Sequence, residues 1–110
     1  MAHMNAYAIA HLRNVRVGPD IVRYLERIDA TLEPFGGRFI VHGGPVDVRE
    51  GESPGTVIVI EFPDRERATA WYDSPAYQEI LPLRTRNADG VAILVDGVDA
   101  DHRATDVLAT

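Results

Sequence analysis

Strand-like and helix-like segments alternate along this chain, and their order limits the fold more than any other feature. Strand patterns, rich in β-branched residues and bounded by turn residues, cover residues 6–12, 38–42, 56–62 and 91–95. Between the first two, apolar residues recur at helical spacing from Pro19 to the Gly36-Gly37 pair. A second helical region begins at Asp64, a predicted N-cap, and is interrupted at Ser74-Pro75. The order is therefore strand, helix, strand, strand, helix, strand.

This order is the split βαβ arrangement, so we expect an α+β fold of the ferredoxin-like type. Its antiparallel four-stranded sheet would carry the helices on one face. The 110 residues suffice for a single domain, which we place at residues 4–97. Residues 1–3 have the composition of a cloning remnant, and residues 98–110 are expected to form a polar C-terminal tail.

The sheet face without helices is also expected to be apolar, because the strands alternate poorly between apolar and polar residues. Monomers rarely expose an apolar patch of that size. The simplest cover is a second copy of the chain, packed sheet against sheet about a two-fold axis. We therefore expect a homodimer.

Charge and composition exclude several classes of function. The net charge of −6 disfavours nucleic acid and anionic membrane surfaces as partners. The absence of cysteine excludes thiol catalysis and zinc–thiolate sites, and the absence of lysine excludes a Schiff base. The chain shows no apolar run long enough to span a membrane and no signal peptide, so we expect a cytoplasmic protein.

Glu61 and His11 are the candidate catalytic residues. Glu61 ends the clearest strand pattern and is partly shielded by its apolar neighbours, which suits a carboxyl group to acid–base chemistry. The alternative for Glu61 is an ion pair with an arginine. We expect the first and third strands to be adjacent and parallel, which places His11 and Glu61 at one end of the sheet and His42 at the other. This placement argues against a metal site built from the three residues, and we predict no metal.

Three aromatic residues, Trp71, Tyr72 and Tyr77, are the first candidates for binding a substrate. Their helical spacing also fits simple core packing, which remains the alternative. Tyrosine and tryptophan have polar tips, however, and often line pockets. We expect a pocket between the sheet and the helices, lined by these residues together with Tyr7 and His11.

Arg84 and His42 complete the candidate binding residues. Arg84 shares a helical face with Tyr77 and Leu81, and a cation on such an apolar face needs an anion. Its partner could be Glu61, Asp73 or a carboxylate of the ligand.

Several motifs carry a family resemblance. They are Gly36-Gly37-Arg38-Phe39 leading into His42-Gly43-Gly44, Val59-Ile60-Glu61-Phe62-Pro63, Ala70-Trp71-Tyr72, Ser74-Pro75 with Tyr77-Gln78, and Pro82-Leu83-Arg84. The chain is similar, over residues 4–97, to the family called domain of unknown function 1330, in the dimeric α+β barrel superfamily. The resemblance implies the fold and dimerisation. The superfamily includes cofactor-free monooxygenases, haem-degrading enzymes, dehydratases and ligand sensors, and fold alone does not choose among them.

Three functions remain open. The first is an enzyme without a cofactor, of the oxygenase, isomerase or dehydratase type, that acts on a small apolar or aromatic molecule. The absence of a phosphate loop and of a dinucleotide fingerprint agrees with an enzyme that binds no nucleotide cofactor. The second is a module that binds such a molecule without turnover, and the third is a structural dimer with a filled core. A cavity of about 300 Å³ or more beside Trp71 and Arg84 would favour the first two.

Overall fold

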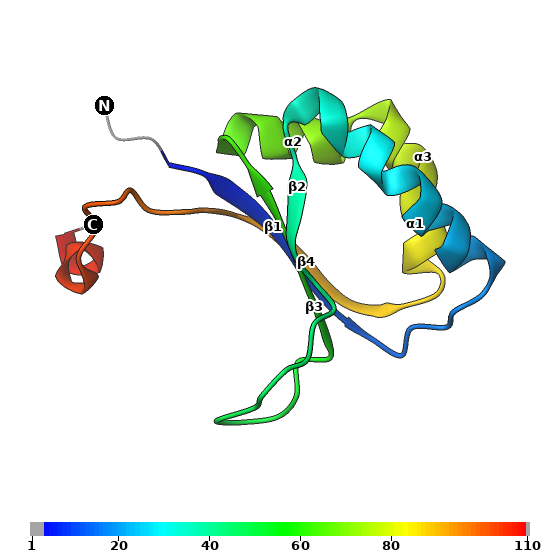
Figure 1. Cartoon of the computed structure of the whole chain (residues 1–110), viewed down its shortest axis with the longest axis horizontal. Coiled ribbons are helices and arrows are strands. Elements are labelled where there is room, and N and C mark those ends of the chain that lie inside the picture. The colour runs from blue at the N-terminus through cyan, green and yellow to red at the C-terminus, as the bar shows by residue number, and fades with distance from the viewer. Residues whose placement is uncertain (1–3, 110) are drawn as a thin grey trace.

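A four-stranded antiparallel sheet forms the base of the computed structural model, which describes residues 4–109 (Figure 1). The strands are β1 (Ala6–Arg13), β2 (Arg38–His42), β3 (Thr56–Phe62) and β4 (Asp89–Asp96). Their order across the sheet is β2-β3-β1-β4, so β1 and β3 are central. This confirms the predicted α+β, ferredoxin-like fold. The predicted cloning remnant, residues 1–3, lies outside the described residues.

Helix α1 (Pro19–Leu32) forms where the sequence predicts it, and a 3₁₀ turn, η1 (Glu33–Phe35), extends it. Pro19 occupies the first turn, where its missing N–H has no helical partner to lose. The apolar stripe of α1 faces inward, with Ile21, Tyr24 and Ile28 all buried. The chain turns away at Gly36, whose φ of 70° is the left-handed conformation that glycine adopts without strain.

Two shorter helices, α2 (Arg65–Asp73) and α3 (Pro75–Thr85), connect β3 to β4. Asp64 is the predicted N-cap of α2, and its carboxylate accepts a hydrogen bond from the Arg67 N–H at 2.8 Å. Ser74 separates the two helices, and its hydroxyl accepts a hydrogen bond from the Tyr77 N–H at the start of α3. After β4, the C-terminal segment ends in a second 3₁₀ turn, η2 (Ala104–Ala109).

The strand register corrects one expectation. We expected β1 and β3 to be parallel, but they are antiparallel, with Tyr7 opposite Glu61 and His11 opposite Val57. The α1 crossover returns β2 in the direction of β1, and the β2–β3 connection then reverses the chain, so β3 must run against β1. His11 and Glu61 therefore lie at opposite ends of the sheet.

The packed core lies between one end of the sheet and helices α2 and α3. Phe62, Trp71, Tyr77 and Ile80 are each at most 2% exposed. The indole N–H of Trp71 donates a 3.0 Å hydrogen bond to the hydroxyl of buried Thr31, which ties α2 to α1. Ile28 and Leu32 of α1 also belong to this core, but residues nearer the start of α1, such as Ile21, line a cavity. Space therefore remains between α1 and the other end of the sheet.

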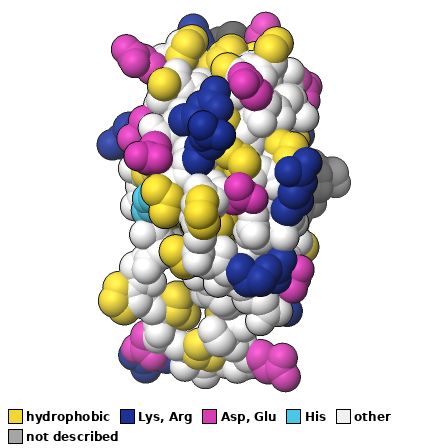
Figure 2. All heavy atoms as spheres, turned by 90° about the vertical axis from the view of Figure 1, so that its right-hand side faces the viewer, with side chains coloured by type: hydrophobic (Ala, Val, Ile, Leu, Met, Phe, Trp, Pro, Cys, Tyr) yellow, Lys and Arg dark blue, Asp and Glu magenta, His cyan; other side chains and the backbone are white. Residues whose placement is uncertain are grey.

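No helix among the described residues covers the opposite face of the sheet (Figure 1). Val41, Val91, Ile93 and Val95 project from this face and are exposed. The β2–β3 loop and the C-terminal segment extend away from the helices in Figure 1. Figure 2 shows the end of the molecule where α1 and α3 lie, and there arginine and acidic side chains are interspersed with apolar ones. Within residues 4–109, no helix is both long and apolar enough to cross a membrane.

Candidate functional site

A cavity of about 580 Å³ lies between the sheet and helices α1 and α3. Small side chains form the middle of its floor, because Ala8 and Ala10 on β1 and Ala92 on β4 project from the face that the helices cover. Ala10 lies directly opposite Ala92 in the strand register. Larger residues at these positions would reach α1 and close the gap. The alanines therefore explain why the core is incomplete at this end.

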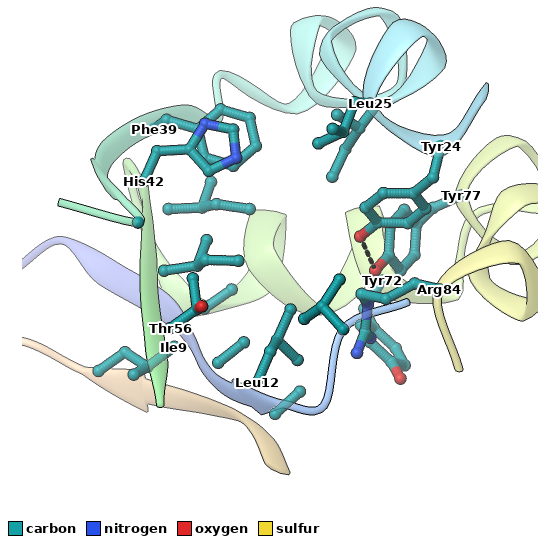
Figure 3. A pocket seen from close by; sticks show the side chains of 18 of the residues that line it. Ile9, Leu12, Tyr24, Leu25, Phe39, His42, Thr56, Tyr72, Tyr77 and Arg84 are labelled. Atoms are coloured by element: carbon teal, nitrogen blue, oxygen red, sulfur yellow. Dashed lines mark hydrogen bonds between the residues drawn. The ribbon is translucent and has the colours of Figure 1, made fainter. Parts of the chain in front are cut away.

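Aromatic side chains form two facing sides of the cavity (Figure 3). On the β2 side, the rings of Phe39 and His42 are stacked, with centroids 4.2 Å apart and planes 10° from parallel. On the helix side lie Tyr24 from α1 and Tyr77 from α3. Leu25 lies at the rim between the two sides and is half exposed, so the cavity opens to solvent there.

Tyr24 and Tyr77 form the main polar contact inside the cavity. Their hydroxyl oxygens are 2.8 Å apart and share a hydrogen bond, and their rings meet edge to face. Burial, reinforced by the neighbouring Tyr77, raises the pKa of Tyr24 well above its ordinary value. Tyr24 is therefore a neutral phenol at physiological pH, able to donate or accept a hydrogen bond but unsuited to act as a base.

Arg84 places a positive charge next to this tyrosine pair (Figure 3). Its guanidinium carbon lies 5.9 Å from the centroid of the Tyr24 ring, within the range of a cation–π contact. Burial lowers the pKa of Arg84, but the hydroxyl groups of Tyr77 and Tyr24 outweigh that effect and the net change is upward. Arg84 is half-buried and remains charged.

Arg84 has no carboxylate partner among residues 4–109. Of the partners that the sequence suggested, Glu61 instead binds Arg38, with a shortest nitrogen–oxygen distance of 3.0 Å. Asp73, the other suggested partner, forms no ion pair with Arg84 either. The remaining suggestion from the sequence is an anionic group on a ligand.

The structure brings together five of the predicted site residues. Trp71, Tyr72, Tyr77, Arg84 and His42 all line the cavity. Trp71 and Tyr77 also belong to the packed core, so the two interpretations of the aromatic group, core packing and pocket wall, hold together.

Three predicted residues lie elsewhere. Tyr7, His11 and Glu61 alternate with the residues that face the helices, so they project from the open face of the sheet. The prediction that Tyr7 and His11 line the pocket is wrong, because a strand sends successive side chains to opposite faces. Glu61 adopts the alternative arrangement, an ion pair with an arginine, on the same open face.

The same register separates the residues considered for a metal site. His42 lies opposite Ile58 and faces the helices, whereas His11 lies at the same end of the sheet but on its other face. Glu61 is at the far end. The part of the chain that the structure describes contains no group of three or more His, Asp or Glu side chains placed to hold a metal ion.

Sequence reasoning missed Tyr24, Phe39 and the alanine floor. Tyr24 lies within the apolar pattern that predicts the helix after Pro19, and a tyrosine in such a pattern needs a partner for its hydroxyl. The alternation Ala6, Ala8, Ala10 along β1 was the available signal for the floor. A central strand that places three alanines in succession on its covered face, before Leu12, leaves room above it.

Comparison with protein families gives one match over most of the chain. The model described as "Domain of unknown function (DUF1330)" matches residues 5–98. A comparison with curated proteins finds no match.

Solved structures with a similar fold come from several organisms. A protein of unknown function from Rhodopseudomonas palustris superposes with a TM-score of 0.63 at 18% identity, over 89% of this chain and 84% of that chain. A dimeric ferredoxin-like protein of unknown function from Jannaschia sp. has a TM-score of 0.53 at 17% identity, over 84% and 96%. SnoaB, a cofactor-independent oxygenase from Streptomyces nogalater, has a TM-score of 0.51 at 11% identity, over 94% and 98%. At these identities the similarity shows the fold alone.

Proposed function

The chain belongs to the DUF1330 family, and we propose that it binds a small, largely apolar molecule in the cavity between its sheet and helix α1. The observation that carries this proposal is the cavity itself. Its volume of about 580 Å³ lies within the usual range of ligand sites, roughly 300–1,000 Å³. Its lining is mostly alkyl and aromatic, with the polar groups of Tyr24, Tyr77 and Arg84 on the helix side and His42 on the facing side. A purely structural dimer with a filled core would not keep this space.

The proposal is tested by calorimetric titration with a neutral aromatic probe, 2-naphthamide. We expect saturable one-to-one binding, accompanied by a higher melting temperature, because a ligand that binds only the native state stabilises it. The variant Ala10→Leu projects three more carbons from the floor into the space that the probe's rings would occupy, without changing a polar group, and it should lose the binding. Unchanged affinity in Ala10→Leu would place the probe elsewhere and contradict the proposal.

The working unit that we propose is a homodimer formed through the open sheet face. Val41, Val91, Ile93 and Val95 supply an exposed apolar surface on that face, and a second copy would cover it. The dimeric ferredoxin-like relative from Jannaschia supports this assembly. Sedimentation at micromolar concentration should give the mass of a dimer, and a charged substitution, Ile93→Asp, should give a monomer. A monomeric mass for the wild-type protein would contradict the proposed homodimer.

Turnover of the bound molecule without a cofactor is the second candidate, and the position of His42 favours it. Its imidazole lines the cavity, and imidazole is the side chain suited to exchanging protons near neutral pH. SnoaB, with a similar fold, is an oxygenase of the cofactor-independent kind. In this protein His42, rather than His11 or Glu61, would take a proton from the ligand.

Catalysis and simple binding can be separated with one variant. If the protein is an enzyme, His42→Gln should lower the rate of product formation at saturating ligand by far more than it lowers probe affinity. A screen of hydroxylated aromatic compounds, followed by oxygen uptake and by mass spectrometry, provides the assay. If no compound that binds is converted, the protein is a binding module.

A further inference from the structure

We propose that the ligand of this cavity is an apolar carboxylic acid, bound as its carboxylate by Arg84 together with the Tyr24–Tyr77 pair. This inference rests on the proposed function and names the class of molecule that the cavity takes. It starts from the surroundings of Arg84. A guanidinium removed from water needs a compensating anion, because an unpaired buried charge is strongly unfavourable.

Arg84 differs in this respect from the other arginines near acidic residues. Arg27, Arg38, Arg49, Arg65 and Arg67 each lie within 4.0 Å of a carboxylate and are substantially exposed. Arg84 is half-buried beside an apolar cavity, and of the residues that the structure describes only aromatic ones, Tyr24 and Tyr77, interact with its charge. The site thus has the cation and the space for an anion.

The tyrosine pair supplies a hydrogen-bond donor beside this charge. Each hydroxyl has one proton, and the 2.8 Å bond between Tyr24 and Tyr77 uses one of the two. The second proton is free to point toward the cavity. A carboxylate oxygen next to Arg84 would accept it, while the guanidinium donates to the same carboxylate in its planar, forked geometry.

The charges around Arg84 favour a ligand with a single negative charge over one with a phosphate group. Arg84 lies in the last turn of α3, and the C-terminal end of a helix carries a partial negative charge. The whole chain has a net charge of −6. One cation in such surroundings offsets a carboxylate but not a dianion.

The rest of the cavity indicates the body of the acid. From the tyrosine pair, the alanine floor extends toward Phe39 and His42 on the facing side (Figure 3). A flat, ring-bearing body would lie on the alanine methyl groups, and its far end would meet the stacked Phe39 and His42 rings. The ligand class is therefore an aromatic or similarly flat carboxylic acid.

The test compares 2-naphthoic acid with 2-naphthamide, which has the same ring system and nearly the same shape but no charge. Titration calorimetry at neutral pH should show that the acid binds wild type at least about tenfold more tightly than the amide. Arg84→Gln should remove this preference, because the acid loses a charge-assisted pair whereas the amide loses only a weaker neutral hydrogen bond. Arg84→Lys, which keeps the charge but loses the fork, should retain part of the preference.

Arg86→Gln is the matched control, since it removes an equal charge from an exposed position two residues away. It should keep the full preference for the acid. Circular dichroism and melting temperature establish that each variant is folded, and Arg84→Lys preserves the test if Arg84→Gln does not fold.

The outcomes separate the inference from the proposed function. Equal affinities for acid and amide in wild type, with amide binding lost in Ala10→Leu, would overturn the carboxylate inference and leave the binding function intact. A loss of preference in Arg86→Gln as large as that in Arg84→Gln would also overturn it, because net charge would then be the cause. Binding of neither probe at millimolar concentration would contradict both.

Discussion

The same substitution at two positions of β1 should change the stability of the protein in opposite directions. Ala6 and Ala10 lie on one strand and face the same side of the sheet. Ala6 is 0% exposed and belongs to the packed core, whereas Ala10 lines the cavity. Leucine adds three carbons at either site.

At Ala10 the added carbons enter empty space. Burial contributes about 0.8 kcal/mol per methylene, so complete burial of three carbons would stabilise by about 2.4 kcal/mol, and we expect roughly 1–2 kcal/mol because the cavity opens at its rim. At Ala6 the same carbons must displace close-packed neighbours such as Phe62, which typically costs about 1–3 kcal/mol.

Urea unfolding of wild type, Ala6→Leu and Ala10→Leu, followed by far-UV circular dichroism, measures both effects. We expect the midpoint to rise for Ala10→Leu and to fall for Ala6→Leu, with similar slopes. If Ala10→Leu destabilises the protein as much as Ala6→Leu does, the space above Ala10 is filled in solution and the reasoning about the cavity is refuted.

Three further predictions concern single residues. Thr31→Val leaves the indole N–H of buried Trp71 without an acceptor and should lower the free energy of unfolding by about 1–3 kcal/mol. Thr31→Ser keeps the hydroxyl and should cost only about 0.8 kcal/mol. Equal losses for the two variants in urea unfolding would contradict the role of this hydrogen bond. Burial raises the pKa of Tyr24, so the native state keeps a phenol proton that the unfolded chain loses above about pH 10. This contribution to the free energy of unfolding is thus complete below that pH and should be lost above it, by up to about 1.4 kcal/mol per pH unit. Tyr24→Phe should remove this part of the pH dependence. Glu61→Gln breaks a surface ion pair with Arg38, whose side chain is 71% exposed, so it should lower the free energy of unfolding by at most about 1 kcal/mol. The affinity for 2-naphthamide should not change. A large loss of affinity would mean that Glu61 takes part in binding.

The elements of the fold follow from local signals in the sequence. The structure has β2 and β3 at the predicted bounds, Arg38–His42 and Thr56–Phe62. Asp64 and Ser74 cap α2 and α3 because both have side-chain oxygens that can accept from a free N–H at a helix start. These signals depend on neighbours within a few residues and can be recognised without the tertiary structure.

The relative direction of strands was the step that failed. Whether β1 runs with or against β3 depends on the connections between them, and we assigned it incorrectly. That error placed His11 and Glu61 at the same end of the sheet, although they lie at opposite ends. A count of the chain reversals, one crossover and one hairpin, would have given the antiparallel arrangement.

The cavity could be predicted only in part. The aromatic group around Trp71 and Tyr77, and the unpaired charge of Arg84, follow from helical spacing and from the cost of burying a cation. Successive residues of a strand face opposite sides of the sheet, so an error of one position moves a side chain to the other face. Tyr7 was assigned to the face that the helices cover, but it lies on the open face. The volume depends on how far α1 stands from the alanine floor, which the packing of α1 against α3 determines.

A crystal structure with 2-naphthamide tests the central claim most directly. The account predicts one molecule per chain between β1 and α1, with its rings over Ala10 and Ala92 and its amide toward Arg84. Saturable binding in solution with the molecule located outside this cavity, for example against the open face of the sheet, would contradict the account.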